Sequence, residues 1–375
     1  MRFPEFSGEW ETYRLGELVE IKSGVSPTGI IDENGIFPFY KVEQLNNCYI
    51  ELDETPYRTM QSAVPAHSII FPKRGAAIMT NKIRIASKAC QLDTNLMALL
   101  LKNNENVDYK FLFYFIARYN LSKIADTSTI PQINNIHISP IKITLPSIHE
   151  QRKISKLLTI LDTKIETQKK IIEKYESLIR GISNKLLYVD KGIPVRLGDI
   201  LLEHSERTKV NNQHEVLSST VKGIFSQREY FSKDIASENN VGYKIIHLHD
   251  VVLSPQNLWM GNINYNDKYD IGIVSPSYKI FSIAESYDKR FVSALLKTHR
   301  ALYNYMLVSE QGASVVRRNL NMEAFEQLVF KMPSIDKQRE VGNAISALQS
   351  RLELAIRVKT AYEKQKQWLL MGMFI

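Results

Sequence analysis

Cysteine is nearly absent from this 375-residue sequence, which contains only Cys48 and Cys90. Neither belongs to a CxxC pair, and two thiols cannot build a disulfide framework, so we expect buried, reduced thiols. No apolar run approaches the roughly 18 residues of a membrane-spanning helix, and residues 1–7 have no apolar signal-peptide core. These absences predict a soluble, cytoplasmic protein that does not enter a membrane.

Sequence signatures of catalysis are also missing. There is no GxxxxGK[ST] phosphate-binding loop, no GxGxxG, no HExxH and no GxSxG. The Asn/Asp-Pro-Pro-aromatic tetrapeptide of amino-methyltransferases is absent too. Methyl transfer and ATP-driven translocation are therefore not expected of this chain, and we predict no catalytic residues and no bound metal.

The composition is that of a globular protein, with 44% hydrophobic and 23% charged residues. The length is sufficient for two or three domains with cores of their own. The formal net charge is +8. A basic excess favours a polyanionic partner, although many basic proteins bind no nucleic acid.

The chain contains a long internal repeat. Pro-Ser-Ile-x-x-Gln-Arg occurs at Pro146–Arg152 and again at Pro333–Arg339. Arg-Leu-Gly followed by an acidic and an apolar residue occurs at Arg14–Leu18 and Arg196–Ile200. The repeated unit is therefore a domain followed by a helix, and such a duplication suits a target that also has two parts.

Each repeat begins with short β-rich runs between turn residues. In the first copy the pattern predicts strands at 19–21, 37–40, 68–71, 82–85, 96–101 and 141–143, and a helix over 109–119. The second copy repeats this order, with a strand at 251–254 and a helix that begins near Phe291. The two copies share their edges and diverge in the middle. One scaffold with two recognition surfaces would produce this pattern, and so would simple drift after duplication.

Each repeat ends in a pattern typical of a long helix. From Ile154 to Leu186 a series of residues follows a regular 4-3-4-3 spacing, as in a heptad repeat. The series is apolar apart from Gln168. Lys359 and Lys366 interrupt the second seam, and we interpret them and Gln168 as register-setting or solvent-edge positions. The residues predicted to join the helices are Leu158, Leu161, Ile165, Ile172, Tyr175, Ile179, Leu348, Leu352, Tyr362 and Leu369.

The short link after Leu187 predicts how the helices pair. About seven residues span at most about 25 Å, so the second domain begins beside the end of the first helix. The second helix then runs back antiparallel to the first. The alternative is that each helix packs on its own domain. We assign residues 1–145 and 191–332 to the two domains, and 146–190 and 333–375 to the two helices.

The order of these features resembles the specificity subunit of type I restriction–modification systems. The resemblance covers the whole chain and rests on the two Pro-Ser-Ile-x-x-Gln-Arg segments, the two Arg-Leu-Gly openings and the domain–helix–domain–helix order. It implies an α+β fold with two similar β-rich target recognition domains. Two long helices that form an antiparallel coiled coil separate these domains, with pseudo-twofold symmetry.

The resemblance also implies a function and a set of partners. Each domain reads one half of a bipartite double-stranded DNA target, and the coiled coil fixes the half-site spacing. Two methyltransferase subunits dock on the coiled coil, and restriction subunits join them. The chain itself performs no chemistry, and S-adenosylmethionine, ATP and Mg²⁺ belong to the partner subunits.

Four polar segments are suited to DNA. Arginine pairs with guanine and Asn or Gln with adenine, whereas lysine mainly contacts phosphates. In each copy one segment follows the strand at 68–71 or 251–254. A second segment precedes Pro146 in the first copy and Pro333 in the second, at equivalent distances. The candidate DNA-binding residues are Lys73, Arg74, Thr80, Asn81, Lys82, Gln132, Asn134, Asn135, Gln256, Asn257, Trp259, Asn262, Arg317, Arg318 and Asn319.

Three other readings compete with this one. Glu20 and Lys22 match half of a metal-dependent nuclease motif, but no Pro-Asp partner lies upstream. The His247–Asp250 segment, His-Leu-His-Asp, resembles a metal clip that lacks a distant third ligand. The chain could also be a coiled-coil adaptor that binds proteins and no DNA.

Overall fold

The computed structural model describes residues 2–46, 50–102, 105–128, 130–186, 192–230, 239–311 and 318–374. The chain divides into two compact units. The first unit comprises Met1–Ile171 with Ala355–Ile375, and the second comprises Ile172–Leu354. Each unit therefore contains one β-rich domain and a part of each of two 39-residue helices, α4 (Ile148–Leu186) and α10 (Ile335–Met373).

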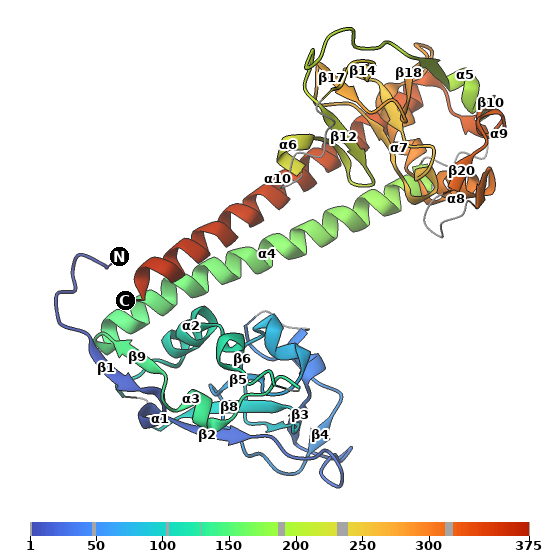
Figure 1. Cartoon of the computed structure of the whole chain (residues 1–375). Coiled ribbons are helices and arrows are strands. Elements are labelled where there is room, and N and C mark those ends of the chain that lie inside the picture. The colour runs from blue at the N-terminus through green and yellow to red at the C-terminus, as the bar shows by residue number, and fades with distance from the viewer. Residues whose placement is uncertain are drawn as a thin grey trace. The chain divides into compact units, whose positions relative to one another are not determined.

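The first unit is built on a four-stranded antiparallel sheet (Figure 1). Its order is β2 (Val19–Ser23), β8 (Leu96–Leu101), β5 (Ile69–Pro72) and β6 (Arg84–Ile85). A three-stranded sheet joins β4 (Arg58–Thr59), β3 (Phe37–Tyr40) and β7 (Gln91–Leu92), and β1 (Glu11–Arg14) pairs with β9 (Lys142–Leu145). The helical elements are α1 (Leu15–Leu18), η1 (Val42–Asn46), η2 (Ala76–Thr80), α2 (Tyr109–Tyr119), η3 (Leu121–Ile124) and α3 (Asn135–Ile138). The strands and the helix predicted for this copy are confirmed.

The second unit repeats the four-stranded sheet with the same connectivity. Its order is β11 (Leu201–His204), β18 (Lys279–Ile283), β15 (Val251–Leu253) and β16 (Ile263–Tyr265). The strands β10 (Ile193–Arg196) and β21 (Val329–Met332) pair as β1 and β9 do. Three further pairs are β12 (Leu217–Thr220) with β13 (Gly223–Ser226), β14 (Lys244–His247) with β17 (Ile271–Val274), and β19 (Ser309–Gln311) with β20 (Arg318–Leu320). The helical elements are α5 (Leu197–Ile200), α6 (Gln227–Tyr230), η4 (Leu258–Met260), α7 (Lys289–Leu296), α8 (His299–Leu307) and α9 (Met322–Glu326).

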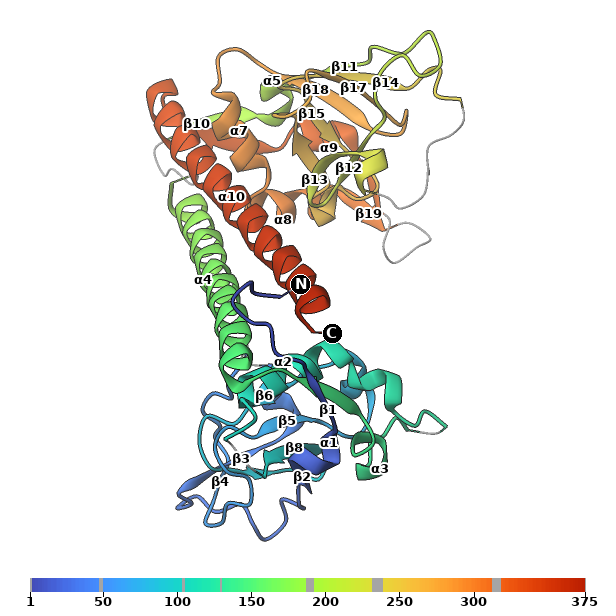
Figure 2. The same cartoon turned by 90° about the vertical axis from the view of Figure 1, so that its left-hand side faces the viewer.

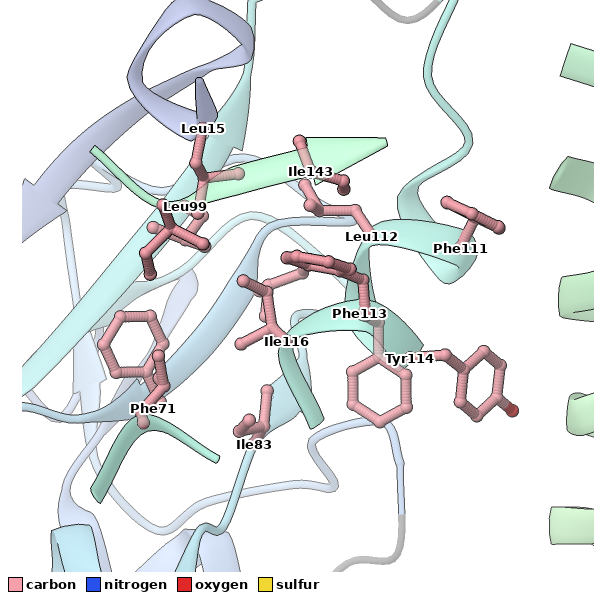
Figure 3. Close-up of a cluster of buried hydrophobic side chains, with 14 of the residues drawn as sticks. Leu15, Phe71, Ile83, Leu99, Phe111, Leu112, Phe113, Tyr114, Ile116 and Ile143 are labelled. Atoms are coloured by element: carbon pink, nitrogen blue, oxygen red, sulfur yellow. The ribbon is translucent and has the colours of Figure 1, made fainter. Parts of the chain in front are cut away.

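The central strands are apolar without interruption because both of their faces are covered. On β8, Met97 and Leu99 face the cluster that surrounds α2, whereas Leu96, Ala98 and Leu100 face a second cluster. Successive strand residues point to opposite faces of a sheet. Figure 3 shows the first cluster, in which Leu99, Leu112 and Ile143 come together from a strand, a helix and the last strand of the domain. In the second unit β15 is divided between two clusters in the same way.

The repeated Arg-Leu-Gly segment closes each domain on itself. Leu15 and Leu197 are buried, and their backbone N–H groups donate to Ile141 O at 2.8 Å and Leu328 O at 2.7 Å. The glycine allows a close approach, because a Cβ on Gly16 would lie 2.9 Å from the Cβ of Ser139. The strand before the repeated Pro-Ser-Ile segment is thereby held at the start of its own domain.

Within each unit the parts of α4 and α10 lie side by side and run antiparallel (Figures 1 and 2). The first unit contains the first turns of α4 and the last turns of α10, where Lys366 pairs with Asp162 and the ammonium of Lys164 lies 5.2 Å from the Tyr362 ring. The second unit contains the opposite ends, where Ile182 of α4 packs against the core cluster that includes Val341 and Ile345 of α10. No helix in the described part of the chain is long and apolar enough to span a membrane.

The helices also complete the domain cores, so the two alternatives considered for them are not exclusive. In the first unit Ile154 and Leu158 of α4 join the core, and so do Leu369 and Met373 of α10. Beyond α10, the Phe374 ring lies 4.9 Å from the Phe111 ring of α2. The first domain is thus packed against the start of α4 and the end of α10, although the end of α10 is more than 200 positions away in sequence.

Candidate nucleic-acid interface

Two of the candidate segments meet in the first unit, although about 57 residues separate them in sequence. Gly75 N donates to Pro131 O at 2.7 Å, and Ile133 N donates to Lys73 O at 2.8 Å. Arg74 and Gln132 form the antiparallel bridge between these two bonds. The segment that follows β5 and the segment that precedes α3 therefore form one continuous surface at the end of the central strand.

This surface presents polar side chains to solvent. Arg74, Asn134 and Asn135 are exposed, and Gln132 is half-buried. Partial burial and the neighbouring guanidinium of Arg74 lower the pKa of Lys73. A cluster of one arginine, one lysine and three amides can donate to phosphates and pair with base edges.

Three of the candidate residues, at the end of η2, make contacts within the protein. The Asn81 side chain donates to Ala117 O at 2.9 Å and accepts from Leu121 N at 3.3 Å, and its φ of 46° ends η2 in the left-handed region. Asparagine tolerates this conformation better than most residues. The Thr80 hydroxyl donates to Ala77 O, and the Lys82 ammonium contacts Asn46 Oδ1. The two Asn81 bonds hold the end of η2 against α2 and η3.

The second unit joins the equivalent segments in the same way. Arg318 N donates to Gln256 O at 3.1 Å, and the guanidinium of Arg318 lies 5.4 Å from the centre of the Trp259 ring. The same guanidinium donates to Met306 O at 3.1 Å. Arg318 therefore ties β20 to the η4 loop and to α8, while the neighbouring Gln256 and Asn319 are exposed. Arg317 lies outside the described residues.

Asn262 is buried beneath this surface. Its amide accepts from the Ser219 hydroxyl at 2.9 Å and donates to Ser219 O at 3.1 Å. Asn257 is half-buried at the N-cap of η4. Asn262 thus connects the η4 loop to the β12–β13 hairpin.

Sequence analysis missed this hairpin. Its turn, Val221 and Lys222, is exposed, and the ammonium of Lys297 lies 3.5 Å from Val221 O. Lys222 and Lys297 add two cations beside the second surface. The signal was present as Leu-Ser-Ser-Thr-Val-Lys-Gly, in which two residues connect short runs and a glycine follows at a φ of 135°.

The candidate residues of the helix pair differ in burial along α4 and α10. Leu158, Leu161, Ile165 and Leu369 are buried, whereas the members towards the middle of each helix are half-buried. These half-buried members are Ile172, Tyr175, Ile179, Leu348, Leu352 and Tyr362. Two helices alone leave the edges of a seam open to water, which explains the partial exposure.

The repeated glutamine of Pro-Ser-Ile-x-x-Gln-Arg has the same buried role twice. Gln151 accepts from Asp108 N at 3.0 Å and donates to Pro146 O at 2.8 Å. Gln338 accepts from Asp288 N at 3.0 Å and donates to Pro333 O at 2.8 Å. Each aspartate is the N-cap of the domain helix, α2 or α7. The glutamine therefore joins the start of each long helix to the start of the domain helix.

The competing metal-dependent readings find no support in the described part of the chain. No group of three or more His, Cys, Asp or Glu side chains there could hold a metal ion. His247 instead pairs with Glu206 at 2.9 Å, and His249 accepts from or donates to the Tyr265 hydroxyl at 2.6 Å. Glu20 and Lys22 lie on β2, opposite Leu100 and Ala98 of β8.

Comparisons with known proteins agree on one family. Residues 7–177 match the model of the type I restriction modification DNA specificity domain. The chain is 23% identical to the MjaVIII specificity subunit of Methanocaldococcus jannaschii over 98% of this chain and 92% of that protein. It is 25% identical to the EcoDI specificity subunit of Escherichia coli over 48% and 37%. The crystal structure of an S subunit from M. genitalium is similar over 100% of this chain and 97% of that chain, with a TM-score of 0.67 at 16% identity.

Proposed function

We propose, because the chain belongs to the type I restriction–modification specificity subunits, that each of its two units reads one half of a bipartite DNA sequence. The function of the chain is DNA sequence recognition within such a system, and it supplies no catalysis of its own. We expect it to act in the cytoplasm, where the DNA is accessible.

The observation that carries the proposal is the paired-segment surface present in both units. In each, the segment after the central strand is hydrogen-bonded to the segment before the last domain strand. The positions are equivalent, but the side chains differ: Arg74 and Gln132 occupy them in one unit, and Gln256 and Asn319 occupy them in the other. Base-reading side chains on a shared scaffold would produce two half-site codes, and lysines such as Lys73 and Lys222 would contact phosphates.

The partner assignments form part of the same proposal. Two methyltransferase subunits would dock on the repeated parts of the chain, and restriction subunits would join them. S-adenosylmethionine would be bound by the methyltransferase subunits, and ATP with Mg²⁺ by the restriction subunits. The seam of α4 and α10 would set the number of base pairs between the half-sites.

Methylome sequencing of cells that carry variant chains tests the reading of bases. Arg74→Ala or Asn135→Ala should relax the first half of the methylated sequence and leave the second half unchanged. Gln256→Ala or Asn319→Ala should do the reverse. Replacing residues 1–145 by those of another family member should change one half only. A change in both halves from one domain would contradict the proposal.

Matched deletions test the spacing role. The Asp162–Lys366 pair places residues 165–171 of α4 opposite 357–363 of α10. Removing both heptads keeps the seam in register and shortens the pair by about 10 Å, because a helix rises about 1.5 Å per residue. The spacer should shorten by about three base pairs at about 3.4 Å each, with the half-sites retained. An unchanged spacer would refute the role.

A further inference from the structure

The repeated Gln-Arg dipeptide contains one residue that the fold explains and one that it does not. Gln151 and Gln338 are 1% and 3% exposed and make matching hydrogen bonds. Arg152 and Arg339 follow them directly and are exposed. Arg152 forms no ion pair with any described residue, and Arg339 has only a long contact of 3.7 Å with the exposed Asp336. Neither guanidinium holds the fold together.

Arg152 borders an open hollow of about 280 Å³ on the first turns of α4. Lys110 of α2 and Lys156 of α4 also line it, and like Arg152 they form no ion pair among the described residues. The one carboxylate in the lining is Asp108, which accepts from Phe111 N at 2.8 Å as the N-cap of α2. Three cations thus surround one carboxylate that already has a backbone partner.

The second unit keeps the same elements at equivalent positions. Asp288 caps α7 and accepts from Phe291 N at 2.9 Å, as Asp108 does on α2. Arg290 follows Asp288 by two positions, as Lys110 follows Asp108, and Arg339 follows Gln338. Arg290 is exposed and donates to Asn343, which occupies the position of Lys156. Both units therefore place a basic residue of the domain helix and an arginine of the long helix near one capping aspartate.

Retention in both copies separates this feature from the DNA-reading surface. The segments around Arg74 and Gln256 differ between the copies, as two codes require. Both copies instead share the Gln-Arg dipeptide and the capping aspartate. Both also have a basic residue two positions after that aspartate. Two copies of one feature on one chain fit two copies of one partner.

We propose that Arg152 with Lys110, and Arg339 with Arg290, are two equivalent docking sites for a carboxylate-bearing surface of the methyltransferase subunit, one subunit at each site. This inference rests on the proposed function, which supplies the partner. The exposed guanidinium can pair with a carboxylate in a bidentate manner, and the adjacent cation lowers the cost of bringing a second acidic group close. Two sites of the same kind, outside the segments that differ between the units, make the two methyltransferase positions independent of the DNA sequence read.

Mass photometry of the chain mixed with its methyltransferase subunit tests the inference. Wild-type chain should hold two subunits. Arg152→Glu and Arg339→Glu should each leave one, with the affinity of the altered site at least about tenfold weaker, as expected when an interfacial charge pair becomes a repulsion. The double variant should hold none at the concentration that saturates the wild type. Two retained subunits in all three variants would overturn the inference.

Arg180→Glu is the matched control, because it makes the same charge change on an exposed part of α4 where the repeat has Gln367. It should retain two subunits, and an equal loss there would overturn the inference in favour of a general charge effect. Intact assembly with a weaker, less salt-dependent affinity for DNA would assign the arginines to phosphates and overturn it as well. A wild-type chain that binds no methyltransferase subunit would overturn the proposed function itself, and the inference with it.

Discussion

The ammonium of Lys366 on α10 lies 2.6 Å from the carboxylate of Asp162 on α4, which is fully buried. Asp162 also accepts a hydrogen bond of 2.7 Å from the Tyr114 hydroxyl, and Figure 3 shows that Tyr114 points outward from the core cluster of α2. One carboxylate therefore connects the domain helix with both long helices. A buried pair of this kind is best attested as a means of setting helix register.

Lys366→Met should lower the free energy of unfolding of the chain by about 3 kcal/mol, because it leaves a buried carboxylate without its cation. Urea unfolding followed by circular dichroism measures this. Removing both charges, in Asp162→Leu with Lys366→Met, should recover most of the loss. The exposed Lys364→Met is the control and should change stability little; an effect as large as that of Lys366→Met would contradict the assignment.

Gln151→Ala and Gln338→Ala should each lower the free energy of unfolding by about 1–2 kcal/mol, because each leaves an N–H and a carbonyl that are at least partly buried without their partner. The two losses should be local. Amide hydrogen exchange should accelerate at the start of α2 for Gln151→Ala and at the start of α7 for Gln338→Ala. Gln349→Ala, at an exposed position of α10, serves as the control. Unchanged exchange in either domain helix would contradict the assigned role of the glutamine in joining the long helix to the domain helix.

Phe374→Ala should destabilise the first unit by about 3 kcal/mol, since it opens a cavity beside Phe111. The same substitution at Met371, which is 68% exposed, should have little effect. Thermal unfolding measures both. If the two variants melt alike, the end of the chain does not contribute to the core of the first domain.

Cys90 should resist thiol reagents at pH 8 in the folded chain. Burial raises the pKa of its thiol from 9.0 to about 12, so the thiolate is scarce and inaccessible. Because the folded state raises this pKa, the contribution of the thiol to stability is complete below about pH 9 and is lost towards pH 12. In a Cys48→Ser background, Ellman's reagent should react only after urea is added. Rapid reaction without urea would contradict this burial.

Much of the fold was predictable because its signals are local. The apolar run 96–101 and the helix over 109–119 are confirmed, since strand and helix periods are written into neighbouring residues. The sequence predicted the antiparallel pairing of α4 and α10 from the short link between them. The sequence pattern predicts Lys366 as a register-setting or solvent-edge position, and it does not identify the partner Asp162, because 204 positions separate the two residues.

The individual roles of the candidate site residues depended on packing. Asn81 and Asn262 are amides in polar loops, as Asn135 is, yet the first two are hydrogen-bonded within the protein. Sequence pattern identifies an amide in a loop but not the carbonyl that faces it. The β12–β13 hairpin was missed for a similar reason, since its short strands become recognisable only when they pair.

The sequence by itself determined the duplication, the order of domain and helix, and the apolar seam, because each is a property of residue spacing along the chain. Only the tertiary structure decided that the separated polar segments join into one surface in each unit, and that the end of α10 completes the core of the first domain. It also distinguished the buried glutamine of the repeated motif from the exposed arginine beside it. Burial and hydrogen bonding depend on which distant groups are brought together, and that information is absent from local spacing.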